Sequence, residues 1–252
     1  MTSSHSVEWT VPDGVSTIQV EVRGAGGKEN GGAGGLVTAT LDVEAGLVLT
    51  MIVGAAGSGL GLTRVSSISP PDFNHKKGGG LVGIFVGGTP YSGGTPLIVA
   101  GSGGGGGGNC GSTGGAGGGE AGQQGRWKID CRNDWTYGEE TFKGSEMVQA
   151  CMGGGGTQTA GGNAGSFPLE GLNLGIDAIA GDAYMGGGHG SYGNDGGAGY
   201  YGGGGGSHCP NMSGGSGGGG SSYAIKEASD VKHVQGGGAR AEGDGSIIIT
   251  YA

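Results

Sequence analysis

Charged residues are scarce in this sequence and make up 13% of its 252 positions. Only 12 residues are Lys or Arg, the formal net charge is -9, and the longest basic run is Lys76-Lys77. A nucleic-acid-binding face needs clustered Lys and Arg to neutralise phosphates. The composition therefore argues against nucleic acid as a partner.

Long apolar runs are missing as well. No stretch approaches the roughly 20 apolar residues that cross a bilayer, so we expect no membrane insertion. The first five residues lack the basic start and apolar core of a secretory signal. We interpret the chain as a mature form renumbered from a longer one, or as a protein that assembles without secretion, as virion components do.

Proline is limited to seven residues, whereas glycine supplies 72, several times its average share of roughly 7%. Collagen needs glycine at every third position and abundant proline, and the glycine runs at 103–108 and 202–206 break that period. A disordered linker would lack periodic apolar segments and aromatics. Because this chain has 34% apolar residues, three Trp and eight Tyr, we expect it to fold.

Cysteine is limited to Cys110, Cys131, Cys151 and Cys209. An even number near glycine-rich segments fits two disulfides, and three connectivities remain open. The spacings match no zinc site of the CxxC type. Asn211 opens one Asn-x-Ser glycosylation triplet, which is weak evidence for secretion. These features favour an extracellular or virion-surface location.

Short apolar runs near both ends of the chain alternate with period two and stop at turn residues, a pattern that predicts β-strands. The expected strands cover residues 7–11, 18–22, 36–43, 47–53, 81–86, 96–100 and 246–251. The first four read as half of one antiparallel sheet, and we expect the terminal strand to return to it. The sequence thus predicts a mainly β fold, in which residues 1–100 and 223–252 form a β-sandwich core.

Residues 101–222 form an inserted region in which glycine runs alternate with more complex segments. Helix is disfavoured because each glycine costs about 1 kcal/mol relative to alanine, and glycine offers a sheet no side chain to pack. The polyproline II conformation suits glycine, since such chains approach closely and bond laterally. Single chains would melt, because ordering each residue costs about 1–2 kcal/mol. We therefore expect a bundle of polyglycine II helices, anchored by the sandwich and the disulfides.

Several stretches resemble a widespread glycine-rich domain family. They are "WTVPDGV" at 9–15, "LTMIVGAAG" at 49–57, "LIVAGSGGGGGG" at 97–108 and "GGAGYYGGGGG" at 196–206. The family includes the extracellular glycine-rich domain of the anaplastic lymphoma and leukocyte tyrosine kinase receptors. The resemblance implies a tumour-necrosis-factor-like sandwich with an inserted polyglycine II bundle, extracellular ligand binding or scaffolding, and no catalysis.

The alternation of glycine runs with complex segments is also similar to the architecture of bacteriophage tail-fibre tip adhesins, an analogy of architecture alone. No kinase domain or membrane span accompanies the module in this sequence. Our leading hypothesis is therefore a structural or adhesive surface protein. The alternative is a soluble extracellular ligand-binding domain of receptor type.

Sequence stretches that partly match cofactor-binding or catalytic motifs lack the neighbouring residues or elements that those motifs require. Residues 24–27 (GAGG) follow a strand, but the next segment, 36–43, reads as a strand and not as the helix that dinucleotide binding requires. The glycine stretch around His189 lacks the aspartates of calcium-binding repeats, and no serine lies in a GxSxG elbow. For His208-Cys209 we favour a disulfide-bonded cysteine beside an exposed loop histidine. We expect no cofactor and no enzymatic activity.

The best binding candidates lie in the polar segments 126–151, 166–185 and 207–213. These segments contain the candidates Trp127, Trp135, Tyr137 and His208. Aromatic residues dominate binding hot spots, although an equal alternative is that they cap the apolar ends of the bundle. The partner class is a protein or a surface glycan, for example on a host receptor, and we expect a homo-oligomer or larger assembly.

Three further tyrosines have a different expected role. Tyr200, Tyr201 and Tyr223 lie next to glycine runs. We expect them to pack between the bundle and the sandwich.

Overall fold

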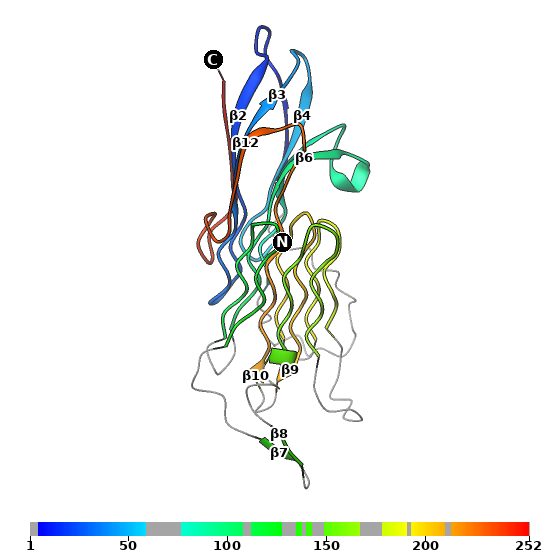
Figure 1. The fold of residues 1–252 in the computed structure, drawn as a ribbon, viewed down its shortest axis with the longest axis vertical. Helices are drawn as coiled ribbons and strands as arrows, with labels where there is room; N and C mark the ends of the chain where they lie inside the picture. The colour runs from blue at the N-terminus through cyan, green and yellow to red at the C-terminus, as the bar shows by residue number, and fades with distance from the viewer. Residues whose placement is uncertain are drawn as a thin grey trace.

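The computed structural model describes residues 5–58, 77–107, 112–127, 135–137, 140–142, 149–166, 178–190, 193–209 and 213–251. Across these residues the fold is mainly β, with two larger antiparallel sheets and two short strand pairs. The molecule is elongated, and the larger sheets occupy the end opposite β7 and β8 (Figure 1). None of the described helices is long and apolar enough to cross a membrane.

Each larger sheet is antiparallel throughout. The five-stranded sheet has the order β1 (His5–Thr10), β4 (Val48–Val53), β5 (Val82–Val86), β6 (Thr95–Ala100) and β11 (Tyr223–Ala224). The four-stranded sheet has the order β12 (Ser229–Val234), β3 (Leu36–Asp42), β2 (Thr17–Arg23) and β13 (Ser246–Thr250). A single 3-10 turn, η1 (Pro90–Ser92), lies between β5 and β6.

The apolar core lies between the two sheets. In β2 every second residue is buried, with Ile18, Val20 and Val22 on the same face, as period-two geometry requires. These residues share one core with Leu49 and Ile98 of the other sheet. The sheets therefore pack face to face in a sandwich-like arrangement. Burial of apolar surface between them stabilises it, since each Å² removed from water contributes roughly 25 cal/mol.

Most of the strands expected from the sequence are confirmed, since β1 to β6 and β13 match them closely. The terminal strand β13 pairs with β2, as expected. The expectation that the first four strands share one sheet is wrong, because β1 pairs with β4 whereas β2 pairs with β3 in the other sheet. Alternation identifies the residues that face the core, but both sheets face the same core, so it does not identify the pairing.

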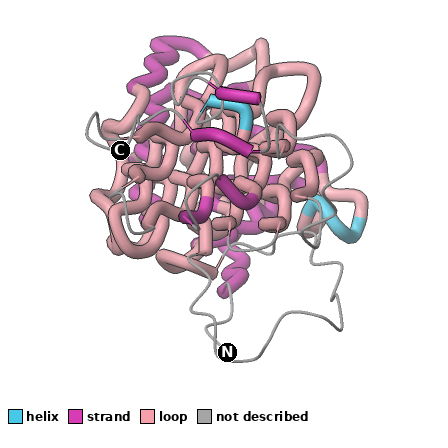
Figure 2. Tube along the Cα trace, turned by 90° about the horizontal axis from the view of Figure 1, so that it is seen from below, coloured by secondary structure: helices cyan, strands magenta, loops and turns pink. Residues whose placement is uncertain are grey.

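The glycine-rich segments extend from the sandwich along the long axis of the molecule (Figure 1). Viewed from below, they form rows of loop segments and contain little regular strand (Figure 2). Near their far end, β9 (His208–Cys209) pairs with β10 (Ser213–Gly214). At the extreme end, β7 (Trp135–Tyr137) pairs with β8 (Glu140–Phe142).

Candidate functional site

Residues 214–222, here called the central run, are buried along their whole length. The backbone N–H groups of residues 217–222 each donate to a carbonyl oxygen on another segment at 2.9 Å. The accepting segment is the same for every third donor of the central run: Gly217 and Gly220 donate to Gly105 and Ser102, Gly218 and Ser221 to Gly204 and Tyr201, and Gly219 and Ser222 to Gln123 and Gly119. Successive N–H groups therefore point toward three different neighbours.

The carbonyl groups of the central run follow the same period. Gly217 and Gly220 accept from Gly115 and Gly118, Ser216 and Gly219 from Gly153 and Gly156, and Gly215, Gly218 and Ser221 from Asn194, Gly197 and Tyr200. Six segments thus surround the central run: 102–105, 115–118, 119–123, 153–156, 194–200 and 201–207. We call the central run and these neighbours the glycine array. Its bonds satisfy backbone groups that would be costly to bury unpaired.

Glycines close to the sandwich join the glycine array. Gly32 and Gly35 donate to Gly104 and Gly101, again at a spacing of three. Gly79 donates to Gly103, and Gly236 donates to Gly117. The stretches 1–100 and 223–252, which the sequence assigns to the sandwich, therefore also contribute to the array.

Close backbone contact explains why the glycine array needs glycine. A Cβ at Gly218 would lie well under 3.0 Å from the carbonyl oxygen of Gly154. A Cβ at Gly217 would overlap the carbonyl oxygen of Asp195 in the same way. Both obstacles are backbone atoms, which cannot rotate aside as the end of a side chain does. Any larger residue at these positions would force the segments apart.

The glycine requirement extends over most of the chain, and so does its match to a known family. The family model of the glycine-rich domain matches residues 2–252. The chain belongs to the glycine-rich domain family. A comparison with curated proteins finds no match. The matched range includes both larger sheets and the whole array of this glycine-rich domain.

A tyrosine cluster joins the array of the glycine-rich domain to its sandwich. The ring of Tyr200 stacks on Tyr223 of β11 with centroids 4.2 Å apart, and Tyr184 meets Tyr200 edge-on at 6.0 Å. Tyr184 also meets the buried Phe85 of β5 edge-on at 5.9 Å. Burial, and next the neighbouring tyrosines, raise the pKa of the Tyr184 phenol. Tyr200, Tyr201 and Tyr223 therefore pack at the junction, as expected from the sequence.

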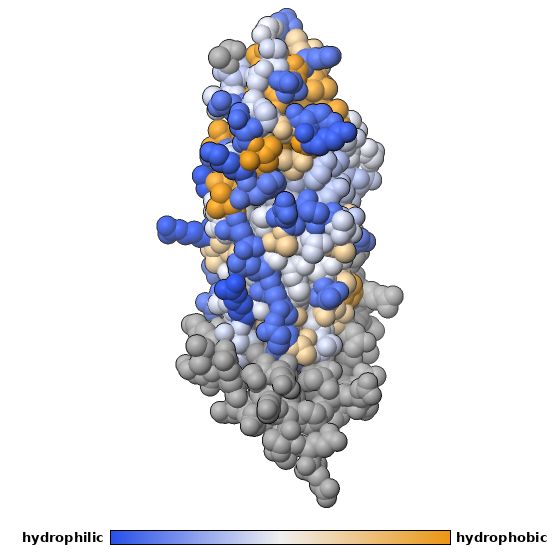
Figure 3. Space-filling view, viewed as in Figure 1, coloured by the Kyte–Doolittle hydropathy of each residue, from blue (hydrophilic) through white to orange (hydrophobic). Residues whose placement is uncertain are grey.

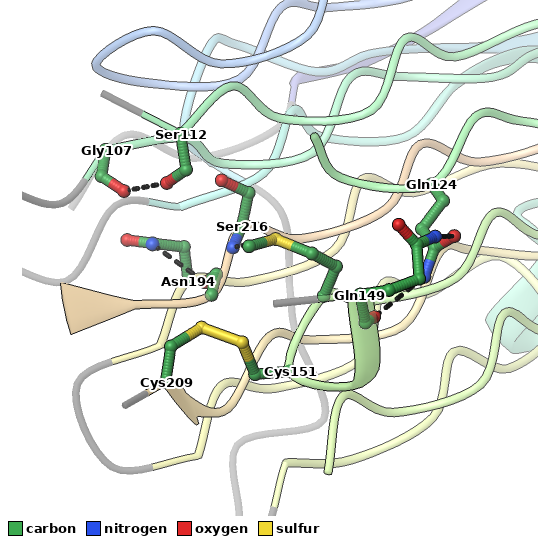
Figure 4. The surroundings of a disulfide bond; sticks show 10 residues. Gly107, Ser112, Gln124, Gln149, Cys151, Asn194, Cys209 and Ser216 are labelled. Carbon is green, nitrogen blue, oxygen red and sulfur yellow. Dashed lines mark hydrogen bonds between the residues drawn. A yellow bond between two sulfur atoms is a disulfide. The ribbon is translucent and has the colours of Figure 1, made fainter. Parts of the chain in front are cut away.

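A disulfide closes the other end of the array. Cys151 and Cys209 are bonded with their Cα atoms 5.5 Å apart, and both are fully buried with Met152 beside them (Figure 4). The backbone N–H of Ser216 donates to the Met152 sulfur at 3.2 Å, which ties the central run to this cluster. The sequence predicts two disulfides without fixing which cysteines pair, and the Cys151–Cys209 bond is one of the possible pairs. Cys110 and Cys131 lie outside the described residues.

Polar side chains support the same end of the glycine-rich domain. The Asn194 amide donates to the carbonyl oxygen of Gly215 at 3.0 Å, Ser112 donates to the carbonyl oxygen of Gly107, and Gln149 donates to Gln124 (Figure 4). The Asn194–Gly215 and Gln149–Gln124 bonds join residues 21 and 25 positions apart in the sequence, whereas the Ser112–Gly107 bond is local. The far end is thus fixed by side chains as well as by the array.

The aromatic binding candidates divide into two groups. Trp127 packs against the buried disulfide cluster, and its Nε1 is buried with no acceptor among the described residues. Trp127 therefore lies at the disulfide end of the glycine array, and its role in binding stays a prediction. Trp135 and Tyr137 form β7, and the structure describes them by their backbone pairing alone.

The remaining candidates are His208 and Asn211. The expectation of an exposed histidine is wrong, because His208 is 7% exposed and lies in β9. Burial lowers the pKa of its imidazole, which favours the neutral form. Asn211 lies outside the described residues, so glycosylation there stays a prediction.

The sequence did not indicate the pairing of His189 with Asp195. The side chain of Asp195 is only 2% exposed. Its carboxylate lies 2.6 Å from Nδ1 of His189 and also accepts a hydrogen bond from the backbone N–H of His189 at 2.9 Å. Asp195 also accepts a bond from Gly105 through its backbone carbonyl. The pair holds the turn between two neighbouring segments of the glycine-rich domain. A motif search misses it because nothing in the spacing of a lone His and Asp distinguishes this contact.

Proposed function

We propose that the chain is a non-enzymatic structural or adhesive protein of a virion or extracellular surface, in which a rigid bundle presents binding segments. The observation that carries the proposal is the three-residue period of hydrogen bonds between the central run and its six neighbours. Three residues per turn is the repeat of polyproline II. We interpret the glycine array as a bundle of polyglycine II helices packed against a tumour-necrosis-factor-like sandwich.

Rigidity follows from how the bundle is held. Its backbone groups bond laterally, the Cys151–Cys209 disulfide joins two segments at the far end, and the tyrosine cluster joins the near end to the sandwich. A binding surface on a rigid support loses less conformational freedom when a partner docks. The bundle therefore suits a protein that must hold contacts at a distance from its core.

The described strands of segments 126–151 and 207–213 lie toward the end of the molecule opposite the sandwich (Figure 1). β7 and β8 belong to segment 126–151, and they lie at the end opposite the sandwich (Figure 1). β9 and β10 belong to or border segment 207–213 and lie toward the same end. We propose that segments 126–151, 166–185 and 207–213 carry specificity for a protein or surface-glycan partner.

The test exchanges residues 135–142 for a Gly-Ser linker of equal length, which leaves Trp127 and Cys151 in place. The matched control replaces Glu44 and Ala45, in the β3–β4 turn of the sandwich, with serine. Fluorescently labelled protein is applied to an array of neutral and sialylated glycans and to intact bacterial and animal cells. We expect the first variant to keep the wild-type melting temperature and lose binding, and the control to keep both.

The result that contradicts the proposal is equally concrete. If the linker variant binds and assembles as the wild type does, the far end does not present the binding surface. If neither the wild type nor the variants bind any probe, while the bundle assembles into larger particles, the adhesive role is wrong and the structural role stands.

The second candidate is an extracellular ligand-binding domain of receptor type. It is favoured by membership of the glycine-rich domain family, together with the resemblance of residues 9–15 and 97–108 to the domain of the anaplastic lymphoma and leukocyte tyrosine kinase receptors. Gene context distinguishes the two candidates. A membrane span and kinase encoded downstream favour a receptor, whereas neighbouring tail or capsid genes favour a virion component.

A further inference from the structure

A second apolar cluster lies between the outer face of the five-stranded sheet and the glycine array. Ile52 and Phe85 are buried there with Ala198 of the array, whereas their neighbours Met51 and Ile84 face the sandwich core. On the side seen in Figure 3, apolar residues gather at the sandwich end and the surface of the array is mostly pale or blue. Glycine segments offer few side chains from which to shape a site, so a pocket with side-chain chemistry can form at this junction.

A pocket of about 110 Å³ lies beside this second cluster. Part of its lining is apolar and comes from Ile52, Leu81 and Ala198. The other described lining residues all carry a hydroxyl group, and they are Ser6, Ser58, Thr89, Tyr91 and Tyr184. None of these eight residues is charged. Since an apolar cavity of roughly 150 Å³ holds one benzene molecule, the pocket takes one ring-sized group at most.

The turn that contains η1 supplies one wall of the pocket. It projects from the sandwich beside β6 (Figure 1). The carbonyl oxygen of Thr89 accepts hydrogen bonds from the backbone N–H groups of Ser92 and Gly94, at 3.0 and 2.8 Å, which fixes the turn. Tyr91 lies within it and is 54% exposed. Its ring is therefore held at the pocket and remains accessible to a ligand.

Tyr184 supplies a second wall from the glycine array. Asp182 and Met185 exchange backbone hydrogen bonds of 3.0 and 3.2 Å, which closes a tight turn around it. The φ of Tyr184 is 64°, a left-handed conformation that bulky residues rarely adopt and that often marks a ligand site. Its ring is fixed by edge-on contacts with Phe85 and Tyr200. This wall is therefore in place before any ligand arrives.

We propose that this pocket binds one neutral sugar residue of a glycan. A sugar ring has apolar C–H faces and a rim of hydroxyl groups. The exposed face of the Tyr91 ring carries the negative charge density that attracts C–H groups. The hydroxyl groups of Ser6 and Thr89 can both donate and accept hydrogen bonds, as the hydroxyl groups of a sugar can. Ring size, apolar lining and hydroxyl groups thus all match the same ligand.

The chemistry of the lining separates this ligand from two others. An acidic sugar would bring a carboxylate to a pocket whose described lining holds no cation, and burying an unpaired charge is costly. An aromatic side chain of a partner protein would fill the apolar part but leave the pocket's hydroxyl groups without partners. The site also goes beyond the proposed function, because it lies at the junction and does not depend on what segments 126–151, 166–185 and 207–213 bind.

The test uses saturation-transfer NMR on the full chain. The probes are methyl glycosides of glucose, galactose, mannose, fucose and N-acetylglucosamine, with glucuronic acid, sialic acid and p-cresol for comparison. We expect at least one neutral glycoside to bind at about 1 mM, and at least about tenfold more tightly than either acid. Tyr91→Ala should weaken that binding at least about tenfold. Ser6→Leu, at an exposed position of β1, narrows the pocket and should do the same.

The matched control is Tyr251→Ala, which removes another exposed tyrosine of the sandwich, 48% exposed, and should leave binding unchanged. Thermal unfolding of the three variants checks that a loss of binding is not a loss of fold. Because the two pocket variants alter different walls, either one that keeps the wild-type melting temperature decides the result.

Each opposite outcome overturns the proposal. If no neutral glycoside binds, or if p-cresol binds and the sugars do not, the pocket is not a sugar site. If a folded Tyr91→Ala or Ser6→Leu variant binds as the wild type does, the sugar lies elsewhere. The variant with a linker at residues 135–142 should keep this binding. Its loss there would assign the sugar to the far end, which supports the proposed function and contradicts the junction site.

Discussion

Gly218 donates its backbone N–H to the carbonyl oxygen of Gly204 across 2.9 Å, in the interior of the glycine array. A methyl group at Gly218 would overlap the carbonyl oxygen of Gly154. We expect Gly218→Ala to lower the free energy of unfolding by about 3 kcal/mol, the upper end of the usual cost of overpacking. Urea denaturation followed by circular dichroism measures this change.

Gly46 provides the matched control for that substitution. It lies in the β3–β4 turn with open space around its Cα and a left-handed φ of 82°. Alanine there costs only the conformational penalty of about 1–2 kcal/mol. If Gly218→Ala costs no more than Gly46→Ala, close backbone packing is not what requires glycine in the array.

Loss of the Cys151–Cys209 bond is expected to destabilise the far end. The bond closes a loop with a sequence separation of 58, and such bonds contribute about 2–4 kcal/mol. We expect the double variant Cys151→Ala/Cys209→Ala to unfold at lower urea concentration than the wild type under oxidising conditions. Equal midpoints for the two proteins would contradict a stabilising role.

The pH dependence of stability follows from the buried His208 and the half-buried His233. Burial lowers the pKa of His208, and it lowers that of His233 against a smaller opposing effect of Glu120. The unfolded chain, with a histidine pKa of about 6.5, therefore binds more protons than the folded chain below that pH. Stability is complete above this value and declines as the pH falls through it.

The measurement for this effect is the free energy of unfolding between about pH 7 and pH 5, the range around the unfolded histidine pKa. We expect it to fall less steeply for His208→Gln than for the wild type. His5→Gln, at an exposed position of β1, is the control and should keep the wild-type slope. A wild-type slope in His208→Gln would mean that this histidine does not contribute.

The Tyr200–Tyr223 stack should stabilise the junction between the array and the sandwich. Tyr200→Ala removes a half-buried ring that contacts three other tyrosines, and we expect a loss of about 3 kcal/mol. Tyr200→Phe keeps the ring and should cost less than about 1 kcal/mol. Thermal unfolding compares the two, and similar losses would mean that the hydroxyl and not the stacking is important.

The sequence predicts the sandwich better than the array. Strands such as β2 and β3 are recognisable in the sequence because alternate residues are apolar and face one core. β12 was not predicted, since its sequence SDVKHV is charged and exposed. The split of the first four strands between two sheets was not predictable either, because alternation carries no information on pairing.

The sequence of a glycine run cannot predict which segments lie beside it. Glycine has no side chain, so a run carries no pattern that tells one neighbour from another, and only the packed backbones select Gly204 as the acceptor for Gly218. The junction role of Tyr200 and Tyr223 was predictable, because large aromatic rings beside glycine need an apolar surface. Of the binding candidates, the sequence left Trp127 open between two roles, and the burial of His208 was missed.

The backbone hydrogen bonds of the central run return to the same neighbour at every third residue, which restricts how many residues can be inserted or deleted there. Three residues inserted into the central run would return each later N–H to its former direction, one level farther along the glycine array. One or two inserted residues would turn every later N–H toward a different neighbour. Changes of length within the glycine array should therefore come in multiples of three residues.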